Sequence, residues 1–310
     1  MVTLRRMRIT RTIAFVTAGG VYGLIVLGAV VRITGSGMGC GDDWPMCNGR
    51  LIPSLSDLPT LIEWTHRLVA LIVSVMVASL AALTWLRRSE PGMAGPGGPL
   101  RPALLAVVLL VVQIMLGAIT VWLELPPATV VLHLGTAMAL LAVVLVSGLR
   151  AAARVSASPS PAQNAAAGRD APWAVTAAVL GAITILLGGV TASVHAGPAC
   201  QGFPLCSGQW WPAAPSGLPA IHWVHRLAAY GLFAYLLLIL ALPSRAALAF
   251  KRPIWLALAL AVVQIAVAAA MVLLALPTGW RALHAAVGTL VWIALVWWLW
   301  TARQPHAASA

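Results

Sequence analysis

The chain has 310 residues, of which 61% are hydrophobic and only 8% are charged. This composition excludes a water-soluble globular protein and indicates an integral membrane protein. The formal net charge of +12 does not indicate nucleic acid binding, because the basic residues are spread between apolar runs instead of clustering on one face.

Apolar runs long enough to cross a bilayer predict an all-α membrane protein with eight transmembrane helices. The first run follows the basic segment 1–11 and is too long for the apolar core of a signal peptide, so we expect it to remain as an uncleaved span. The predicted spans cover residues 12–31, 61–86, 103–123, 128–149, 172–194, 219–242, 253–275 and 281–301.

Basic residues predict the orientation of these spans, because Lys and Arg are enriched in cytoplasmic segments. A cytoplasmic N-terminus places 14 of the 19 Lys and Arg residues on the cytoplasmic side, and the C-terminus then lies there as well. The loops after the first and fifth spans would lie outside.

A stretch rich in alanine, serine and proline divides the chain into two halves of four spans. We expect an N-terminal half at 1–150, a cytoplasmic linker at 151–171 and a C-terminal half at 172–310. Four spans per half bring both halves into the membrane from the same side, which predicts a parallel internal repeat. The matching features are Cys47 with His66 and Cys206 with His225, each 19 residues apart, Gln113 with His133 and Gln264 with His284, each 20 residues apart, and Val-Val-Gln-Ile at 111–114 and 262–265.

The four cysteines form two close pairs, Cys40 with Cys47 and Cys200 with Cys206, in the two outer loops. An even count in segments that face an oxidising compartment predicts two disulfides. Zinc binding is the alternative, although both spacings are wider than is usual for zinc-binding cysteines.

Four histidines lie at matched depth inside the predicted spans. His66 and His133 in the first half, like His225 and His284 in the second, would lie roughly 8–9 Å below the outer edge of the apolar layer. Two imidazoles at equal depth on neighbouring helices of a bundle can ligate one iron from opposite sides, which predicts one heme-sized site per half. The alternative for each histidine is a hydrogen bond to a neighbouring helix.

Glu63 is the acid of the pattern Glu-Trp-Thr-His-Arg at 63–67, and His222 takes its place in His-Trp-Val-His-Arg at 222–226. Ionisable groups inside a membrane are rare and commonly functional. A carboxyl one turn from a heme ligand could act as a general base, so only the first half would carry out chemistry. The alternative for Glu63 is a hydrogen bond or a salt bridge with an arginine.

Arg67 and Arg226 follow ligand histidines, and Arg281 precedes His284 by three residues. Their planar guanidinium groups suit heme propionates. Extension toward lipid headgroups is the alternative. His195 and His306, in an outer loop and the C-terminal tail, have no assigned role.

These residues resemble the heme A synthase family, in its bacterial form with cysteine pairs in the outer loops. The resemblance covers essentially the whole chain. It rests on Val-Arg-Ile-Thr-Gly-Ser-Gly-Met-Gly-Cys at 31–40, Asp-Trp-Pro-Met-Cys-Asn-Gly at 43–49, Glu-Trp-Thr-His-Arg at 63–67 and Phe-Pro-Leu-Cys at 203–206.

The resemblance implies a multi-pass protein of the bacterial plasma membrane that oxidises the C8 methyl of heme O to the formyl group of heme A. Two successive oxidations would give a gem-diol that loses water. His66 and His133 would hold the substrate heme O, and His225 and His284 would ligate a heme B cofactor. Glu63 matches the family's essential acid. Membrane lipid, heme O synthase and the cytochrome oxidase assembly apparatus are the implied partners.

Two other functions remain open at this point. A di-heme b-type electron-transfer protein would explain the four histidines, but neither Glu63 nor the cysteine pairs. A heme transporter or chaperone would also bind heme, but would leave its structure unchanged.

Overall fold

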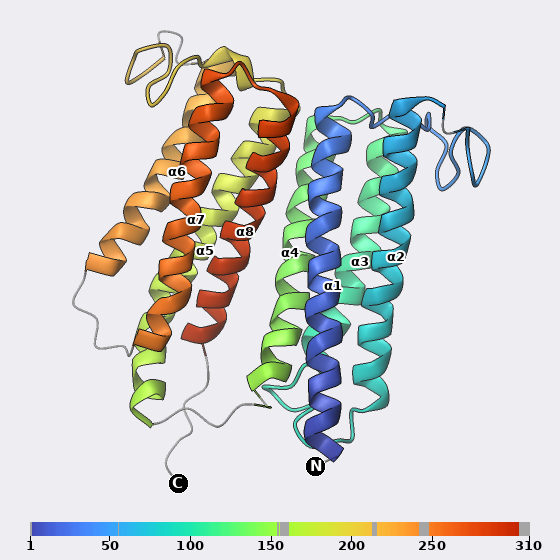
Figure 1. The fold of residues 1–310 in the computed structure, drawn as a ribbon, viewed down its shortest axis with the longest axis vertical. Coiled ribbons are helices and arrows are strands. Elements are labelled where there is room, and N and C mark those ends of the chain that lie inside the picture. The colour runs from blue at the N-terminus through green and yellow to red at the C-terminus, as the bar shows by residue number, and fades with distance from the viewer. Residues whose placement is uncertain are drawn as a thin grey trace. The chain divides into compact units, whose positions relative to one another are not determined.

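The computed structural model describes residues 2–54, 56–153, 155, 161–212, 216–241 and 248–303. These residues form eight α-helices, one short 3-10 helix and no strand, so the predicted all-α class is confirmed (Figure 1). Each of the eight helices contains a segment long and apolar enough to cross a membrane. The helices are α1 (Val2–Ile33), α2 (Leu58–Leu86), α3 (Leu100–Trp122), α4 (Pro127–Ala153), α5 (Pro161–Ser193), α6 (Leu218–Ala241), α7 (Leu248–Leu273) and α8 (Thr278–Ala302), with the 3-10 helix η1 at Gly197–Ala199.

Two helices begin well before their predicted spans. Helix α1 starts at Val2 instead of residue 12, and α5 starts at Pro161, inside the predicted linker. Hydrophobicity marks only the part of a helix that suits the membrane, whereas arginine and alanine favour helix on either side of that boundary. Within the described residues, Arg5–Ile33 of α1 and Ala171–Ser193 of α5 are long and apolar enough to cross a membrane. His306 lies outside the described residues.

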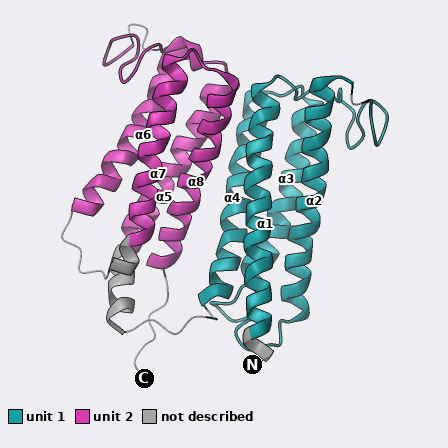
Figure 2. Ribbon diagram, viewed as in Figure 1, with its two compact units in different colours: residues 1–157 teal, residues 158–310 magenta. Residues whose placement is uncertain are grey.

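The chain divides into two compact units, unit 1 at residues 1–157 and unit 2 at residues 158–310 (Figure 2). In unit 1, α1 and α3 each pack against both α2 and α4, so the four helices form a closed ring. Val77, Leu80 and Leu141 are fully buried between them. Many other large apolar side chains on these helices are exposed, as expected for a surface that faces lipid.

Within unit 2, α5 and α7 each pack against both α6 and α8. Leu236, Leu295 and Trp298 lie in the centre of its apolar core, together with small residues such as Ala257 that allow close helix approach. The parallel internal repeat stays a prediction.

Sharp turns join the last two helices of each unit. Glu124 and Leu125 adopt φ of 57° and 63°, and Ala275 and Leu276 adopt φ of 62° and 63°. The N–H of Leu125 donates to the carbonyl of Thr120 at 2.8 Å, which closes the end of α3. Each turn is followed at once by the helix that carries His133 or His284, so the turns set the depth of these histidines.

Candidate functional site

Both predicted disulfides are present. Cys40 is bonded to Cys47 in the first cysteine loop (residues 34–57, between α1 and α2). Cys200 is bonded to Cys206 in the second cysteine loop (residues 194–217, between α5 and α6). No cluster of three or more metal-binding side chains occurs in the described part of the chain, so the zinc alternative has no support. His195 is exposed at the start of the second loop.

Glu63 connects helix α2 to the first cysteine loop. Its side chain is buried, one carboxylate oxygen accepts the Cys40 N–H at 2.8 Å, and the other pairs with the Arg67 guanidinium at 2.5 Å. Arg67 also donates to the carbonyl oxygens of Asp43, at 2.6 Å, and Met46. The carboxylate and guanidinium therefore fasten both ends of the disulfide segment to α2. The salt bridge that we considered as the alternative for Glu63 is present.

Arg226 occupies the corresponding position in unit 2. It donates to the carbonyl oxygens of Gly202 and Leu205, both at 2.9 Å, and to that of Cys200 at 2.6 Å. Its Nε donates to Nε2 of His222 at 3.2 Å, where unit 1 has a carboxylate. Both side chains are buried. Arg67 and Arg226 thus make loop contacts that the sequence did not predict, and their pairing with heme propionates stays a prediction.

His225 and His284 lie close together in unit 2. Their ring centroids are 6.4 Å apart and their planes are nearly perpendicular. Nδ1 of His225 lies 3.1 Å from the backbone carbonyl of Thr184, a contact that makes Nδ1 the protonated nitrogen and directs the Nε2 lone pair away from α5. Gly188 makes this approach possible, since a Cβ there would lie 2.9 Å from Cε1 of His225.

This spacing fits a metal bound between the two rings. An imidazole nitrogen lies about 2 Å from a metal that it ligates and about 1.1 Å from its own ring centroid, so two opposed ligands have centroids about 6 Å apart. The separation of the His225 and His284 rings is therefore compatible with an iron held between them.

His66 and His133 occupy comparable surroundings in unit 1. His133 lies against Gly117, and its Nε2 is 3.0 Å from the side-chain amide nitrogen of Gln113. His66 lies against Gly28, where a Cβ would be 3.2 Å from Cε1. Nδ1 of each histidine is buried without a hydrogen-bond partner. A buried nitrogen without a hydrogen-bond partner is unusual in a purely structural histidine, and it is consistent with a histidine that binds a ligand.

Two glutamines contribute to these sites although the sequence pattern gave them no role. The Gln264 amide nitrogen lies 3.0 Å from Nδ1 of His284 and donates to the His284 carbonyl, as Gln113 approaches His133 in unit 1. The amide oxygens of both glutamines are buried and unpartnered. The repeated Val-Val-Gln-Ile carried the signal, because a glutamine within an apolar span needs a polar partner.

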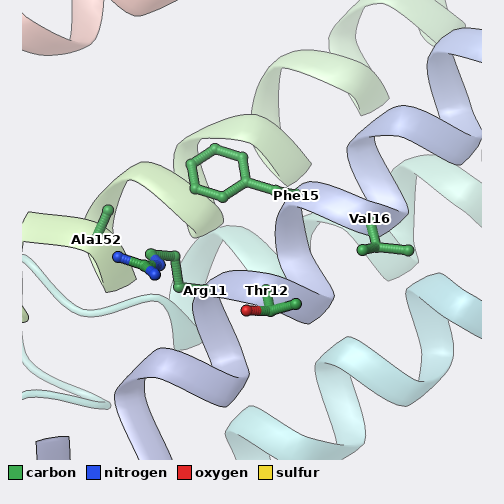
Figure 3. Close-up of a pocket in the computed structure, with 5 residues that line it drawn as sticks. All are labelled: Arg11, Thr12, Phe15, Val16 and Ala152. Carbon is green, nitrogen blue, oxygen red and sulfur yellow. The ribbon is translucent and has the colours of Figure 1, made fainter.

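A separate surface groove lies near the start of α1. Its volume is 550 Å³ and it is lined by residues of α1 and α4, as Figure 3 shows. None of the predicted site residues lines it. The lining residues are Arg11, Thr12, Phe15, Val16 and Ala152.

Comparison with known proteins places the chain in a family. A family model described as cytochrome oxidase assembly protein matches residues 11–296. The chain is 32% identical over 232 residues to a protein of Shouchella clausii named heme A synthase, a match that covers 74% of each chain. Proteins with the same name from Halalkalibacterium halodurans (33% over 231 residues, 73% of this chain and 72% of the relative) and Bacillus licheniformis (31% over 276 residues, 84% and 85%) are also similar. The chain therefore belongs to the COX15-CtaA family of cytochrome oxidase assembly proteins.

Proposed function

We propose that this protein is a heme A synthase, an enzyme that oxidises the C8 methyl group of heme O to a formyl group. The observation that carries the proposal is the family match over residues 11–296, with relatives named heme A synthase that align over most of both chains. The histidine pair of each unit supports it, because a membrane enzyme that acts on heme needs iron ligands within its helices.

The two units divide the work in this proposal. His66 and His133 hold the substrate heme O in unit 1, whereas His225 and His284 ligate a resident heme B in unit 2. The 6.4 Å separation of the His225 and His284 rings supports the cofactor site. A glycine packs against His66 and another against His225 (Gly28 and Gly188, the glycine notches), which supports equivalent roles for these two side chains. When bound, heme B supplies one-electron transfer chemistry. The protein's contribution is to fix both imidazoles within a water-poor bundle.

Glu63 acts in unit 1 as the acceptor of a proton released as the substrate methyl is oxidised. Its carboxylate holds the Cys40 N–H and the Arg67 guanidinium and still has lone pairs for a further partner. Unit 2 has His222 at this place. This difference supports chemistry in unit 1 alone.

The disulfide of the first cysteine loop serves this carboxylate by ordering Cys40. The Cys40 N–H donates directly to Glu63, so a loop that loses the bond to Cys47 would loosen the acid as well. We expect Cys40→Ala to lower heme A formation in membranes that contain heme O. Formation at the wild-type rate would remove this role from the disulfide.

Arg67 and Arg226 have a second role in the proposal, as partners of heme propionates. After the contacts described above, the guanidinium of Arg67 has two N–H groups left and that of Arg226 has one, and a guanidinium N–H is a strong donor to a carboxylate. A weaker affinity of Arg226→Gln than of wild type for heme B, measured by titration, is the expected result. Unchanged affinity would refute the propionate role of Arg226.

The topology completes the proposal. Both termini lie in the cytoplasm, both cysteine loops lie outside, and the units are parallel copies of one four-helix bundle in a bacterial plasma membrane. The excess of basic residues in the segments assigned to the cytoplasm and the two disulfides support this orientation. Heme O synthase and the cytochrome oxidase assembly apparatus are the proposed neighbours. Cysteine labelling from outside intact cells, with single cysteines placed in the α2–α3 connection, tests the orientation and would refute it if these sites reacted.

Co-expression with a source of heme O tests the proposed reaction. Hemes extracted from the membranes are separated by chromatography and identified by mass. We expect heme A to accumulate only where the protein is present. Bound heme B together with unmodified heme O, with the redox partners present, would instead support an electron-transfer protein or a heme carrier.

A further inference from the structure

An arginine follows the predicted ligand histidine in both units, half-buried in unit 1 and buried in unit 2, but its polar neighbour one turn earlier carries a different charge. Arg67 forms an ion pair with Glu63 at 2.5 Å, and the side chains are 15% and 4% exposed. Arg226 instead donates to neutral Nε2 of His222 at 3.2 Å, and these residues are 6% and 5% exposed. Unit 1 thus neutralises this cation and unit 2 does not.

The surrounding chain strengthens this difference. Residues 171–310 contain no Asp or Glu, so no acidic side chain after the start of the fifth span can oppose Arg226. Arg281, half-buried and three residues before His284, adds a second cation at the same end of unit 2. The segments at the corresponding end of unit 1 contain three arginines and five carboxylates. They are Arg32, Arg50 and Arg67, with Asp42, Asp43, Asp57, Glu63 and Glu124.

The remaining acid of unit 2 is far from the ligand histidine along the backbone of α5. Asp170 lies 18 residues before Gly188 in α5, which corresponds to about 27 Å along the helix axis. Gly188 is the residue that contacts the His225 ring. Charges at such a separation interact weakly, whereas those in the first turns of α6 and α8 lie close to the ligand histidines in a medium of low dielectric.

Uncompensated positive charge affects a heme iron in one direction. Reduction of ferric to ferrous iron adds one electron, so a nearby fixed cation stabilises the reduced form and raises the reduction potential. Charge outside the ligand set is one of the means by which a protein sets this potential. Each heme carries its own propionates into either unit, so they do not create the difference that His222 creates.

We propose that His222, which stands where unit 1 has a carboxylate, leaves Arg226 without an acidic side-chain partner in unit 2, and that this charge, together with that of Arg281, raises the reduction potential of the heme held by His225 and His284. This inference rests on the proposed function, because it assumes the heme B site of unit 2. His222 is then a residue that sets a potential, without contact to the iron. It gives a role to the residue that stands in the place of Glu63.

Potentiometric titration of the purified holoprotein, with redox mediators and the visible spectrum of low-spin heme as readout, tests the proposal. His222→Glu should lower the midpoint potential of the unit 2 heme, whereas the neutral His222→Gln should leave it close to wild type. His222→Asp provides the same test if the glutamate variant does not fold. Equal potentials in the carboxylate variants and His222→Gln would overturn the inference.

Arg281→Gln gives an independent measurement that leaves His222 and its partner intact. Removal of this cation should lower the same midpoint potential. Arg303→Gln is the matched control, since position 303 lies 19 residues after His284, about 28 Å along α8, and should have no effect. An unchanged potential in Arg281→Gln would contradict the proposed role of unopposed charge.

These outcomes also separate the inference from the function on which it rests. A wild-type protein that holds no low-spin heme, or that keeps this heme in His284→Ala, would refute the heme B site and the inference with it. A heme that is lost in His284→Ala but keeps its potential in His222→Glu and His222→Asp would refute the inference alone.

Discussion

Glu63 binds the first cysteine loop to α2 and is also the proposed proton acceptor. Its two oxygens hold the Cys40 N–H and the Arg67 guanidinium, and it lies one turn before His66 in α2. A buried carboxylate that is paired and hydrogen-bonded keeps a defined orientation, which a proton acceptor requires. The sequence predicted that this acid matters, but not that the cysteine loop would fix it.

Glu63→Gln should therefore retain an acceptor for the Cys40 N–H while losing the negative charge and the ability to take a proton. Because general base catalysis contributes about 10²–10⁴-fold, we expect heme A formation to fall by at least about 10²-fold. Heme B should remain bound. The rate of heme A formation and the heme B content, measured on the same preparation, check both statements, and an unchanged rate would exclude a catalytic role for Glu63.

Gly188 allows His225 to approach α5, and its substitution tests that contact. A Cβ at this position would lie 2.9 Å from Cε1 of His225, so Gly188→Ala should displace the imidazole. Overpacking of this kind typically costs about 1–3 kcal/mol, which corresponds to roughly 5–150-fold weaker heme B binding. Gly231→Ala in α6 is the matched control because a Cβ there has no neighbour within 4 Å. Titration with heme B should separate the two variants, and equal affinities would contradict the assigned contact.

At the scale of the helix, α2 begins at a cap that also holds the first cysteine loop. Asp57 accepts the N–H and the hydroxyl of Thr60, at 3.0 and 2.7 Å, and the Thr60 hydroxyl also lies 2.7 Å from the carbonyl oxygen of Gly39. The Thr60 side-chain and backbone hydrogen bonds hold the pKa of Asp57 below its ordinary value of 3.8. A lowered pKa means that the cap contributes its stability above that value and loses it as the pH falls through the folded-state pKa.

The wild-type protein should thus lose stability relative to Asp57→Asn as the pH is lowered from neutral to below 3.8. Asparagine also caps helices but does not titrate in this range, and the other carboxylates are common to both proteins. Thermal unfolding of the two detergent-solubilised proteins across this pH range measures the effect. A difference in Tm that does not change with pH would argue against the cap.

The helices and the disulfides could be predicted from the sequence because their signals are local. Long apolar runs located all eight membrane segments, and paired cysteines in the predicted outer loops indicated the bonds. Helix ends such as Val2 and Pro161 could not be predicted, since the hydrophobic signal stops before the helix does. The glycine notches were missed for another reason, because Gly188 and His225 are far apart in sequence and meet only when α5 packs on α6.

At the scale of the whole molecule, the chain consists of two compact units, each with two membrane histidines near a cysteine loop. Matched spacings in the sequence predicted which histidines belong together, and in unit 2 the rings of His225 and His284 lie 6.4 Å apart; their role as ligands stays a prediction. The contacts of Arg67 and Arg226 could not be predicted, because they depend on where the loop carbonyls lie after folding. The difference between Glu63 and His222 was visible in the sequence. The structure adds that Glu63 forms an ion pair with an arginine, whereas His222 accepts a hydrogen bond from one.

The division of labour between the units is the central claim, and the heme B content of two purified variants tests it most directly. Heme extracted from His284→Ala and from His133→Ala, produced alongside wild type, is identified by chromatography and quantified per protein. We predict that His284→Ala loses heme B, while His133→Ala retains it but no longer converts heme O. Retention of heme B by His284→Ala, or its loss from His133→Ala, would contradict the assignment of cofactor and substrate to the two units.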